Sequence, residues 1–212
     1  PATGLPVYSL YREDSQHMTP EMLDLVDTVI YDIQDIGARF YTYISTLLYV
    51  MRDCAAAGKE LVVLDRINPL GGKIEGGMLQ PGFESFVGVY PLTTRYGLTP
   101  GEFARLANEE QHIGCTLHVL PVQGWRRKML FPETGLTWMM PSPAIPHFET
   151  ALLYPGVCLA EATNLSEGRG TSAPFELIGA PFINGAALTA RMNALKLPGV
   201  AFTAAYFTPS AS

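Results

Sequence analysis

The chain has 212 residues, 48% of them hydrophobic and 16% charged, with a formal net charge of -6. This length supports one large domain, or a domain with a smaller lobe, around a buried core, and the composition excludes intrinsic disorder. The negative charge without clustered Lys and Arg argues against a nucleic-acid partner, and no apolar run approaches the roughly 20 residues of a membrane span.

The first half of the chain alternates apolar runs with helical patterns. We expect strands over residues 6–11, 28–33 and 61–64, a helix beginning at Thr19-Pro20, and a helix over residues 43–57 that ends at Gly58. The apolar run 28–33 is typical of a strand covered on both faces. A strand, a helix and a strand in succession indicate a right-handed crossover within a parallel sheet.

The composition of the sequence changes after Asp65. Residues 67–98 are rich in Gly and Pro and predict a long structured excursion with room for a hairpin. A capping box at residues 99–102 predicts a helix to about Gln111, and a strand should follow over residues 116–120. We then expect loops over 121–150, a short strand over 157–159, a polar segment over 161–171 and a helix over 186–195.

The apolar residues 28–31 are followed directly by an acid, Asp32, and a second acid, Asp35, comes three residues later. Asp32 and Asp35 would lie at the carboxyl end of a parallel strand, where ligands bind in open α/β sheets. Gly37 allows the chain to turn close to a ligand, and Arg39 can pair with an acid or with a ligand carboxylate. The alternative is structural, with Asp35 capping the next helix and Asp32 bound to Arg39.

The same arrangement recurs at the end of the next strand. The segment 65–72, with the sequence DRINPLGG, places an acid, Asp65, beside Arg66 and Asn68 before a glycine-rich loop. Two neighbouring parallel strands would each bring a carboxylate and a guanidinium to one edge of the sheet. This repetition favours a functional site over a coincidence.

A third polar cluster spans residues 161–171, with the sequence EATNLSEGRGT. Its two acids, its arginine, its asparagine and its hydroxyls suit a ligand with many hydroxyl groups. The alternative is a surface ion pair between Glu167 and Arg169.

Other chemistries lack their sequence signals. The four histidines and three cysteines show no metal-ligand spacing, so we predict no metal and free thiols in buried surroundings. No phosphate loop, no dinucleotide fingerprint and no G-x-S-x-G motif occurs, and we predict no cofactor. Paired carboxylates perform acid/base work on acetals, which narrows the function to glycoside hydrolysis or sugar binding. The aromatic residues Trp125, Trp138, Tyr90 and Tyr96 could stack on a sugar ring or belong to the core.

Three motifs together resemble the NamZ-type exo-β-N-acetylmuramidases, a family of bacterial peptidoglycan-recycling enzymes. They are DIQDIGARFYTY at residues 32–43, DRINPLGG at 65–72 and NLSEGRGT at 164–171, and the resemblance continues through PFELIGAP at 174–181. It implies release of terminal N-acetylmuramic acid from the non-reducing ends of peptidoglycan fragments. It also implies an α/β fold with a Rossmann-like parallel sheet and flanking helices over residues 1–150, and part of a smaller α+β C-terminal subdomain over 151–212.

The chain departs from the family pattern in two respects. Ile67 stands where the family usually has Pro, and members are about twice as long. They carry a further strand upstream, ending in a Glu-His-Gly motif that is a candidate for a catalytic acid. Because the chain opens without Met and closes outside any expected element, we expect both subdomains to be incomplete.

These considerations give a set of expected site residues. The catalytic carboxylates would be Asp32, Asp35 and Glu161. The substrate, a saccharide derived from peptidoglycan, would be bound by Arg39, Tyr41, Asp65, Arg66, Asn68, Asn164, Glu167, Arg169 and Thr171. The lactyl carboxylate of the sugar would suit one of the three arginines. The alternative function is a non-catalytic module that binds muropeptides or sugars, and the expected location is periplasmic or secreted, otherwise cytoplasmic.

Overall fold

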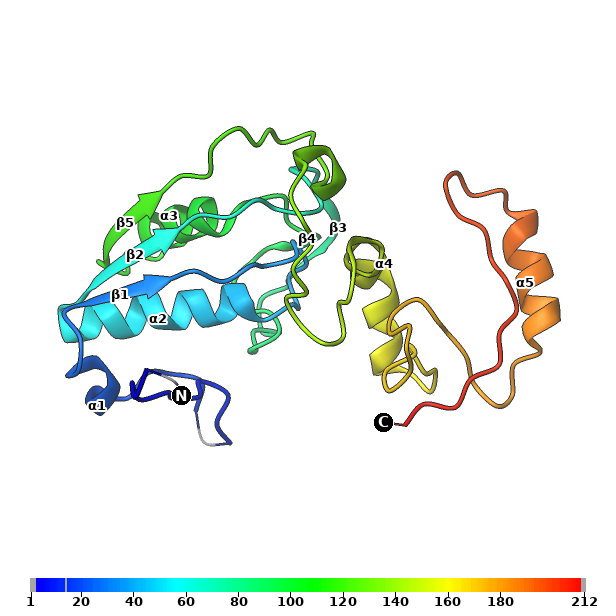
Figure 1. The fold of residues 1–212 in the computed structure, drawn as a ribbon, viewed down its shortest axis with the longest axis horizontal. Coiled ribbons are helices and arrows are strands. Elements are labelled where there is room, and N and C mark those ends of the chain that lie inside the picture. The colour runs from blue at the N-terminus through cyan, green and yellow to red at the C-terminus, as the bar shows by residue number, and fades with distance from the viewer. Residues whose placement is uncertain (1–2, 14, 211–212) are drawn as a thin grey trace. The chain divides into compact units, whose positions relative to one another are not determined.

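The computed structural model describes residues 3–13 and 15–210. The chain divides into two compact units, Pro1–Thr137 and Trp138–Ser212, and each is described by itself (Figure 1).

A parallel three-stranded sheet organises the first unit. Strands β1 (Thr28–Tyr31), β2 (Glu60–Leu64) and β5 (Thr116–Leu120) lie in the order β1-β2-β5. Both neighbouring pairs are parallel, with Val29 opposite Leu61 and Leu61 opposite Leu117. Helices α2 (Tyr43–Ala57) and α3 (Pro100–Glu110) form the connections. The predicted strand-helix-strand pattern and the parallel sheet are confirmed.

The helices begin and end at the residues that their capping signals predict. The Thr19 hydroxyl accepts a hydrogen bond at the start of the short helix α1 (Pro20–Leu23). Helix α2 ends at Gly58, whose φ of 65° is the left-handed conformation that glycine adopts without strain. At α3, Thr99 and Glu102 form the reciprocal capping box.

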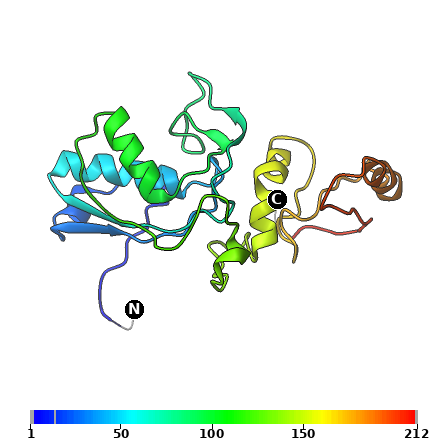
Figure 2. The ribbon, with the colours of Figure 1, turned by 90° about the horizontal axis from the view of Figure 1, so that it is seen from above.

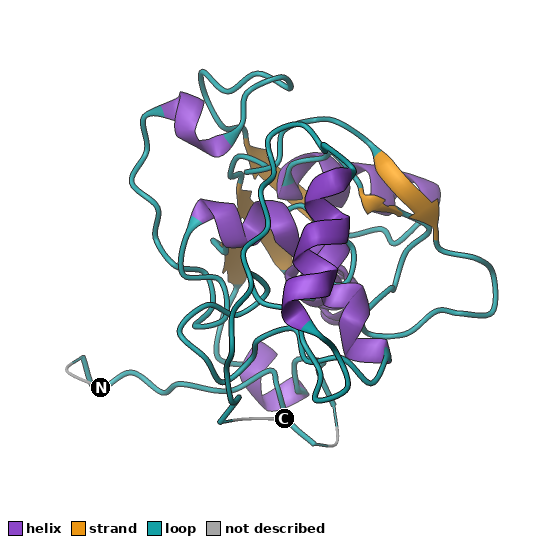
Figure 3. Ribbon diagram, turned by 90° about the vertical axis from the view of Figure 1, so that its right-hand side faces the viewer, coloured by secondary structure: helices purple, strands orange, loops and turns teal. Residues whose placement is uncertain are grey.

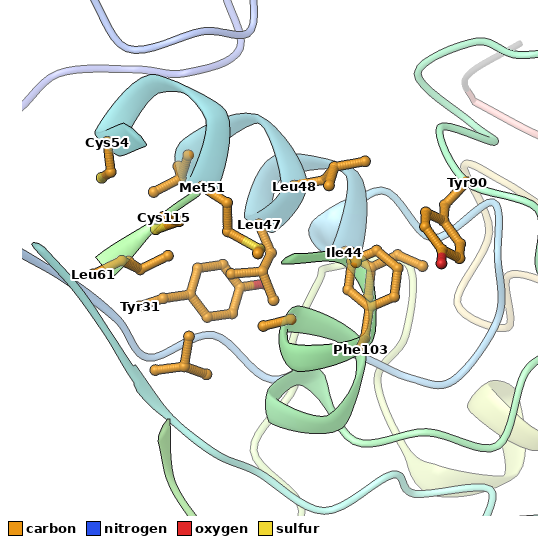
Figure 4. Packing of buried hydrophobic residues seen from close by; sticks show 14 of the residues in the cluster. Tyr31, Ile44, Leu47, Leu48, Met51, Cys54, Leu61, Tyr90, Phe103 and Cys115 are labelled. Carbon is orange, nitrogen blue, oxygen red and sulfur yellow. The ribbon is translucent and has the colours of Figure 1, made fainter. Parts of the chain in front are cut away.

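The core of this unit lies between the sheet and its two helices. Tyr31 and Leu61 from the strands pack against Leu47 and Met51 of α2 and against Phe103 of α3 (Figure 4). Figure 2 shows α2, in cyan, and α3, in green, on the same side of the sheet.

The opposite face of the sheet is open in the described residues. Ile30 is 63% exposed and Leu120 is 53% exposed, so the prediction that residues 28–33 are covered on both faces is wrong for this chain. The strand order explains the difference: successive crossovers of the same hand that advance in one direction place their helices on one face.

The glycine-rich excursion forms a second, smaller sheet. Strands β3 (Glu75–Met78) and β4 (Thr93–Arg95) pair in antiparallel fashion and are drawn apart from the main sheet in Figure 3. A short 3-10 helix η1 (Phe131–Thr134) follows later in the chain. The expected strand over residues 6–11 is wrong: this segment pairs with no described strand, and Val7 and Tyr8 are exposed. An extended segment without a hydrogen-bonded neighbour does not become part of a sheet.

The second unit is built from helices and loops. It contains α4 (Phe148–Val157), η2 (Cys158–Ala162) and α5 (Gly185–Ala194), and an isolated bridge joins Ser166 to Gly179. The expected strand over residues 157–159 is wrong, because α4 continues directly into η2 there. A short apolar run does not by itself distinguish a strand from a helix. The last predicted helix is confirmed as α5. Within the described residues no helix is both long and apolar enough to cross a membrane.

Candidate functional site

Asp32 and Arg66 meet at the carboxyl edge of the parallel sheet. Tyr31 of β1 lies opposite Val63 of β2, so the residues that follow the two strands are neighbours. The Nε and Nη2 atoms of Arg66 both lie 2.7 Å from Oδ1 of Asp32. Both side chains are close to half exposed, at 42% for Arg66 and 47% for Asp32. The two strand-end motifs thus present one solvated ion pair.

Asp35 lies in the same motif but in a buried environment. It is 2% exposed, and its Oδ2 accepts hydrogen bonds from the Gly37 amide at 2.6 Å and from the Tyr96 hydroxyl. Burial raises the pKa of Asp35 to about 7, while the hydrogen bonds from Tyr96 and Gly37 oppose that rise. A substrate cannot reach this carboxyl group in the conformation observed. Neither expected alternative, a helix cap by Asp35 or an Asp32–Arg39 pair, is formed.

The Asp65 carboxylate binds the N-terminus of helix α3. Its Oδ1 accepts from the amides of Gly101 at 2.7 Å and Arg66 at 3.0 Å, and its Oδ2 accepts from the Thr99 hydroxyl at 2.8 Å. A carboxylate at a helix N-terminus is stabilised by the unpaired amides there. A Cβ at Gly101 would lie 2.7 Å from Cγ of Asp65, so this approach needs glycine. The geometry favours a structural role for Asp65 over contact with substrate.

Asn68 is also part of the packing behind the edge. It is 2% exposed, donates from Nδ2 to the Leu98 carbonyl at 2.9 Å and accepts from the Leu70 amide at 3.0 Å. Gly37 packs directly on it. The geometry therefore favours a structural role for Asn68 as well.

Arg39 and Tyr41 face the protein more than the solvent. Nη1 of Arg39 donates to the carbonyls of Gly77 at 2.9 Å and Leu92 at 2.6 Å, which ties this loop to the smaller sheet. Tyr41 is 8% exposed and contacts the ring of Tyr43 edge-on. Their roles in binding substrate stay predictions.

In the second unit, Glu161 and Arg169 form an exposed ion pair. Nε and Nη2 of Arg169 lie 2.8 and 2.7 Å from Oε1 of Glu161, and Nε lies 3.4 Å from Oε1 of the buried Glu167. The guanidinium also lies over the Phe175 ring, 5.0 Å from its centre. Arg169 pairs more closely with Glu161 than with Glu167, the partner that sequence spacing indicated.

The remaining expected residues of this loop differ in their surroundings. Asn164 is exposed. Thr171 donates from its hydroxyl to the Gly168 carbonyl at 2.6 Å and stabilises the turn. A further polar cluster of the second unit was not predicted: Oε1 of Glu176 lies 2.7 Å from Nε2 of His147 and accepts a hydrogen bond from the Thr150 hydroxyl. They are separated in sequence, so no local spacing could have predicted them.

The first unit also contains residues that motif reasoning missed. Tyr96 was considered only for sugar stacking or the core, yet its buried hydroxyl is bound to Asp35. Gln34 bridges two loops by donating to the carbonyls of Asp35 at 2.6 Å and Ile67 at 3.0 Å. The capping box did predict the position of Thr99, but not its bond to Asp65.

The chemistry of the described groups is that of carboxylates and guanidinium groups. Within residues 3–13 and 15–210 no cluster of three His, Cys, Asp or Glu side chains has metal-binding geometry. Cys54 and Cys115 are buried and free, as predicted, whereas Cys158 is free and only partly buried. Burial raises the pKa of the Cys54 thiol to about 12 and that of Cys158 to about 11, which makes both poor nucleophiles.

Fold and site together define an α/β protein with an exposed carboxylate–guanidinium pair at the carboxyl ends of parallel strands. Two family models match it: "Exo-beta-N-acetylmuramidase NamZ, N-terminal" over residues 1–149 and "Exo-beta-N-acetylmuramidase NamZ, C-terminal" over residues 152–212. The chain belongs to the NamZ family.

Known relatives agree in sequence and in fold. A peptidoglycan beta-N-acetylmuramidase NamZ from Bacillus subtilis strain 168 is 51% identical over 211 residues, which are 99% of this chain and 51% of that protein. A DUF1343 family protein from Bacteroides fragilis superposes with a TM-score of 0.87 at 46% identity, over 95% of this chain and 53% of its own. A second DUF1343 family protein from the same species superposes with a TM-score of 0.73 at 34% identity, over 79% of this chain and 48% of its own. The chain spans about half the length of these relatives.

Proposed function

We propose that this protein is a glycoside hydrolase that releases terminal N-acetylmuramic acid from the non-reducing ends of peptidoglycan fragments. Family membership and the name of the Bacillus subtilis relative support this proposal. The observation that carries it at the level of the site is the solvated Asp32–Arg66 pair at the sheet edge.

Asp32 is the carboxylate best placed to act on the substrate. Acetal hydrolysis needs one carboxyl group that protonates the leaving oxygen and a second that activates water or attacks the anomeric carbon. An exposed carboxylate at the sheet edge suits the second of these roles, because water and a substrate can both reach it. Glu161, exposed in the second unit, is a further candidate carboxylate.

Arg66 is the arginine we propose for the lactyl carboxylate of the sugar. Its Nε and Nη2 atoms are directed to a single oxygen of Asp32, and the side chain is 42% exposed. By contrast, Nη1 of Arg39 already binds two carbonyls, and Arg169 lies among two glutamates and a phenyl ring.

Release of the chromophore from a para-nitrophenyl β-N-acetylmuramide by the full-length protein tests the proposal. We expect turnover by the wild type and a loss of roughly a hundredfold or more in Asp32→Asn, the scale for an acid/base or nucleophilic group. A folded wild type that binds the glycoside in calorimetry without turnover would instead identify a non-catalytic muropeptide-binding module.

We propose a periplasmic or secreted location, where such fragments arise, with the cytoplasm as the alternative. Fractionation of cells that produce the full-length protein tests this.

A further inference from the structure

Asp35 joins the loop that carries Asp32 to the segment that precedes helix α3. Its Oδ2 binds the Gly37 amide within its own loop and the hydroxyl of Tyr96, which follows β4. The bond within the loop is a local turn of the kind that Asp side chains stabilise. The bond to Tyr96 is long-range and spans 61 residues of sequence.

The hydrogen bonds of Asp35 to Gly37 and Tyr96 form a junction between the two segments. Further contacts connect this junction to the loop that carries Arg66. A Cβ on Gly37 would lie 2.3 Å from Oδ1 of Asn68, so the two loops touch without space between them. Asn68 in turn donates to Leu98, two residues beyond Tyr96, and Gln34 donates to Ile67. The loops that carry Asp32 and Arg66 are thus held by hydrogen bonds and by close packing around Asp35 and Asn68.

We infer that Asp35 is a positioning residue, which holds the Asp32 loop in its working conformation through Gly37 and Tyr96 and does not itself touch the substrate. This inference rests on the proposed role of Asp32. It replaces the expectation that Asp35 is one of the catalytic carboxylates, because a group that is 2% exposed cannot meet a sugar without rearrangement.

The junction has a second property, which makes the inference testable. In the part of the chain that the structure describes, Oδ1 of Asp35 has no hydrogen-bond partner. A neutral carboxyl group tolerates such burial, whereas an ionised one leaves charge on an unpartnered oxygen. Burial raises the pKa of Asp35 to about 7, so the change of state falls within an accessible pH range.

The titratable groups that face Asp35 are the hydroxyls of Tyr31, Tyr41 and Tyr96. Burial is the largest cause that raises the pKa of each, and the charge of Asp35 adds to it, so all three stay neutral over this range. Among the described residues, no ionised side chain contributes to the pKa shift of Asp35. Ionisation strengthens the two hydrogen bonds to Oδ2 but leaves buried charge on the unpartnered Oδ1. Because burial is the larger of these effects, we expect the site around Asp35 to open to water, and Asp32 to lose its orientation, as pH rises through about 7.

The test is kcat and KM between pH 5 and 9 for the full-length wild type, Asp35→Asn and Tyr96→Phe, with the para-nitrophenyl muramide. The wild-type kcat should fall above about pH 7, and Asp35→Asn should lack this decline, because an amide does not ionise. In Tyr96→Phe the decline should move to higher pH, because the lost hydrogen bond stabilised the charged form. KM should change less than kcat, since the Asp35 carboxyl group itself makes no contact with the substrate.

Tyr90→Phe is the matched control. Tyr90 is also buried and its hydroxyl also donates to a carboxylate, that of Glu110, but outside the Asp32 loop. This variant should follow the wild-type pH profile.

A measurement on the free protein, without substrate, separates this inference from the proposed function. The amide resonance of Gly37 should titrate near pH 7 in the wild type and not in Asp35→Asn. If the amide titrates but folded protein never turns over the glycoside, the proposed function fails and the contact stands. If the enzyme is active while Asp35→Asn keeps the wild-type decline, or loses more than a thousandfold in kcat at pH 6, the positioning role is wrong.

Discussion

The carboxyl edge of the parallel sheet has an outer and an inner layer that use the same residue types differently. The outer layer is Asp32 and Arg66, an ion pair in contact with solvent. The inner layer consists of Asp35, Asp65, Asn68 and Thr99, whose polar atoms bind backbone groups and one another. A surface ion pair contributes little to stability, whereas buried polar groups are costly to disturb. The difference teaches that the outer layer is accessible to a ligand while the inner layer is engaged in structural contacts, and we therefore assign the proposed chemistry to the outer layer.

Gly37→Ala should break the inner layer most severely. The residue has a φ of 84°, and a Cβ there would lie 2.3 Å from Oδ1 of the buried Asn68. Backbone strain and overpacking together should lower the free energy of unfolding by about 4 kcal/mol. Denaturant unfolding measures this.

Gly58→Ala separates the two causes. Gly58 also has a positive φ, of 65°, but its Cβ would meet nothing within 4 Å. It should cost only about 1 kcal/mol. Equal costs for the two variants would show that Asn68 does not confine Gly37.

Asp35→Asn should change how stability depends on pH. The folded-state pKa of about 7 lies above the ordinary 3.8, so between these values the folded protein keeps a proton that the unfolded chain has released. The stability that this raised pKa contributes is therefore fully present at low pH, falls by about 4 kcal/mol as pH rises to about 7, and does not change further at higher pH. Unfolding of wild type and variant in parallel from pH 4 to 8 measures the difference, and parallel curves would contradict the raised pKa.

Thr99→Ala should have a moderate effect. The hydroxyl accepts from the Glu102 amide at 3.2 Å to cap α3 and donates to Asp65 at 2.8 Å. Its loss should cost about 2 kcal/mol, the upper range for a capping residue. Thr19→Ala is the matched control, because Thr19 caps a helix of only four residues and should cost less.

The sequence predicted the elements whose signals are local. Capping residues predicted the starts of α1 and α3, Gly58 predicted the end of α2, and apolar runs predicted β1, β2 and β5. The strand predicted over residues 6–11 was wrong because strand formation depends on a partner that no local pattern reveals. The strand predicted over residues 157–159 was wrong because a short apolar run does not distinguish a strand from a helix. The exposure of Ile30 likewise depends on where the crossovers place their helices.

The sequence predicted where the site lies, but not which of its polar residues are exposed and which are buried. The positions of Asp32 and Arg66 follow from strand ends in a parallel sheet. The division between Asp32 and Asp35 could not be foreseen, because it depends on Tyr96, which lies 61 residues away in sequence. In the same way Asp65 has the spacing of a site residue, yet its environment is set by Gly101 and Thr99.

The most direct test of this division compares Asp32→Asn with Thr99→Ala in the full-length protein, measuring kcat per folded molecule and the free energy of unfolding for both. Asp32→Asn should lose roughly a hundredfold or more in kcat while its stability changes by less than about 1 kcal/mol. Thr99→Ala should lose about 2 kcal/mol of stability and keep its kcat within about threefold of the wild type. Wild-type turnover in Asp32→Asn, or a loss in Thr99→Ala as large as the one expected for Asp32→Asn, would contradict the assignment of chemistry to the outer layer.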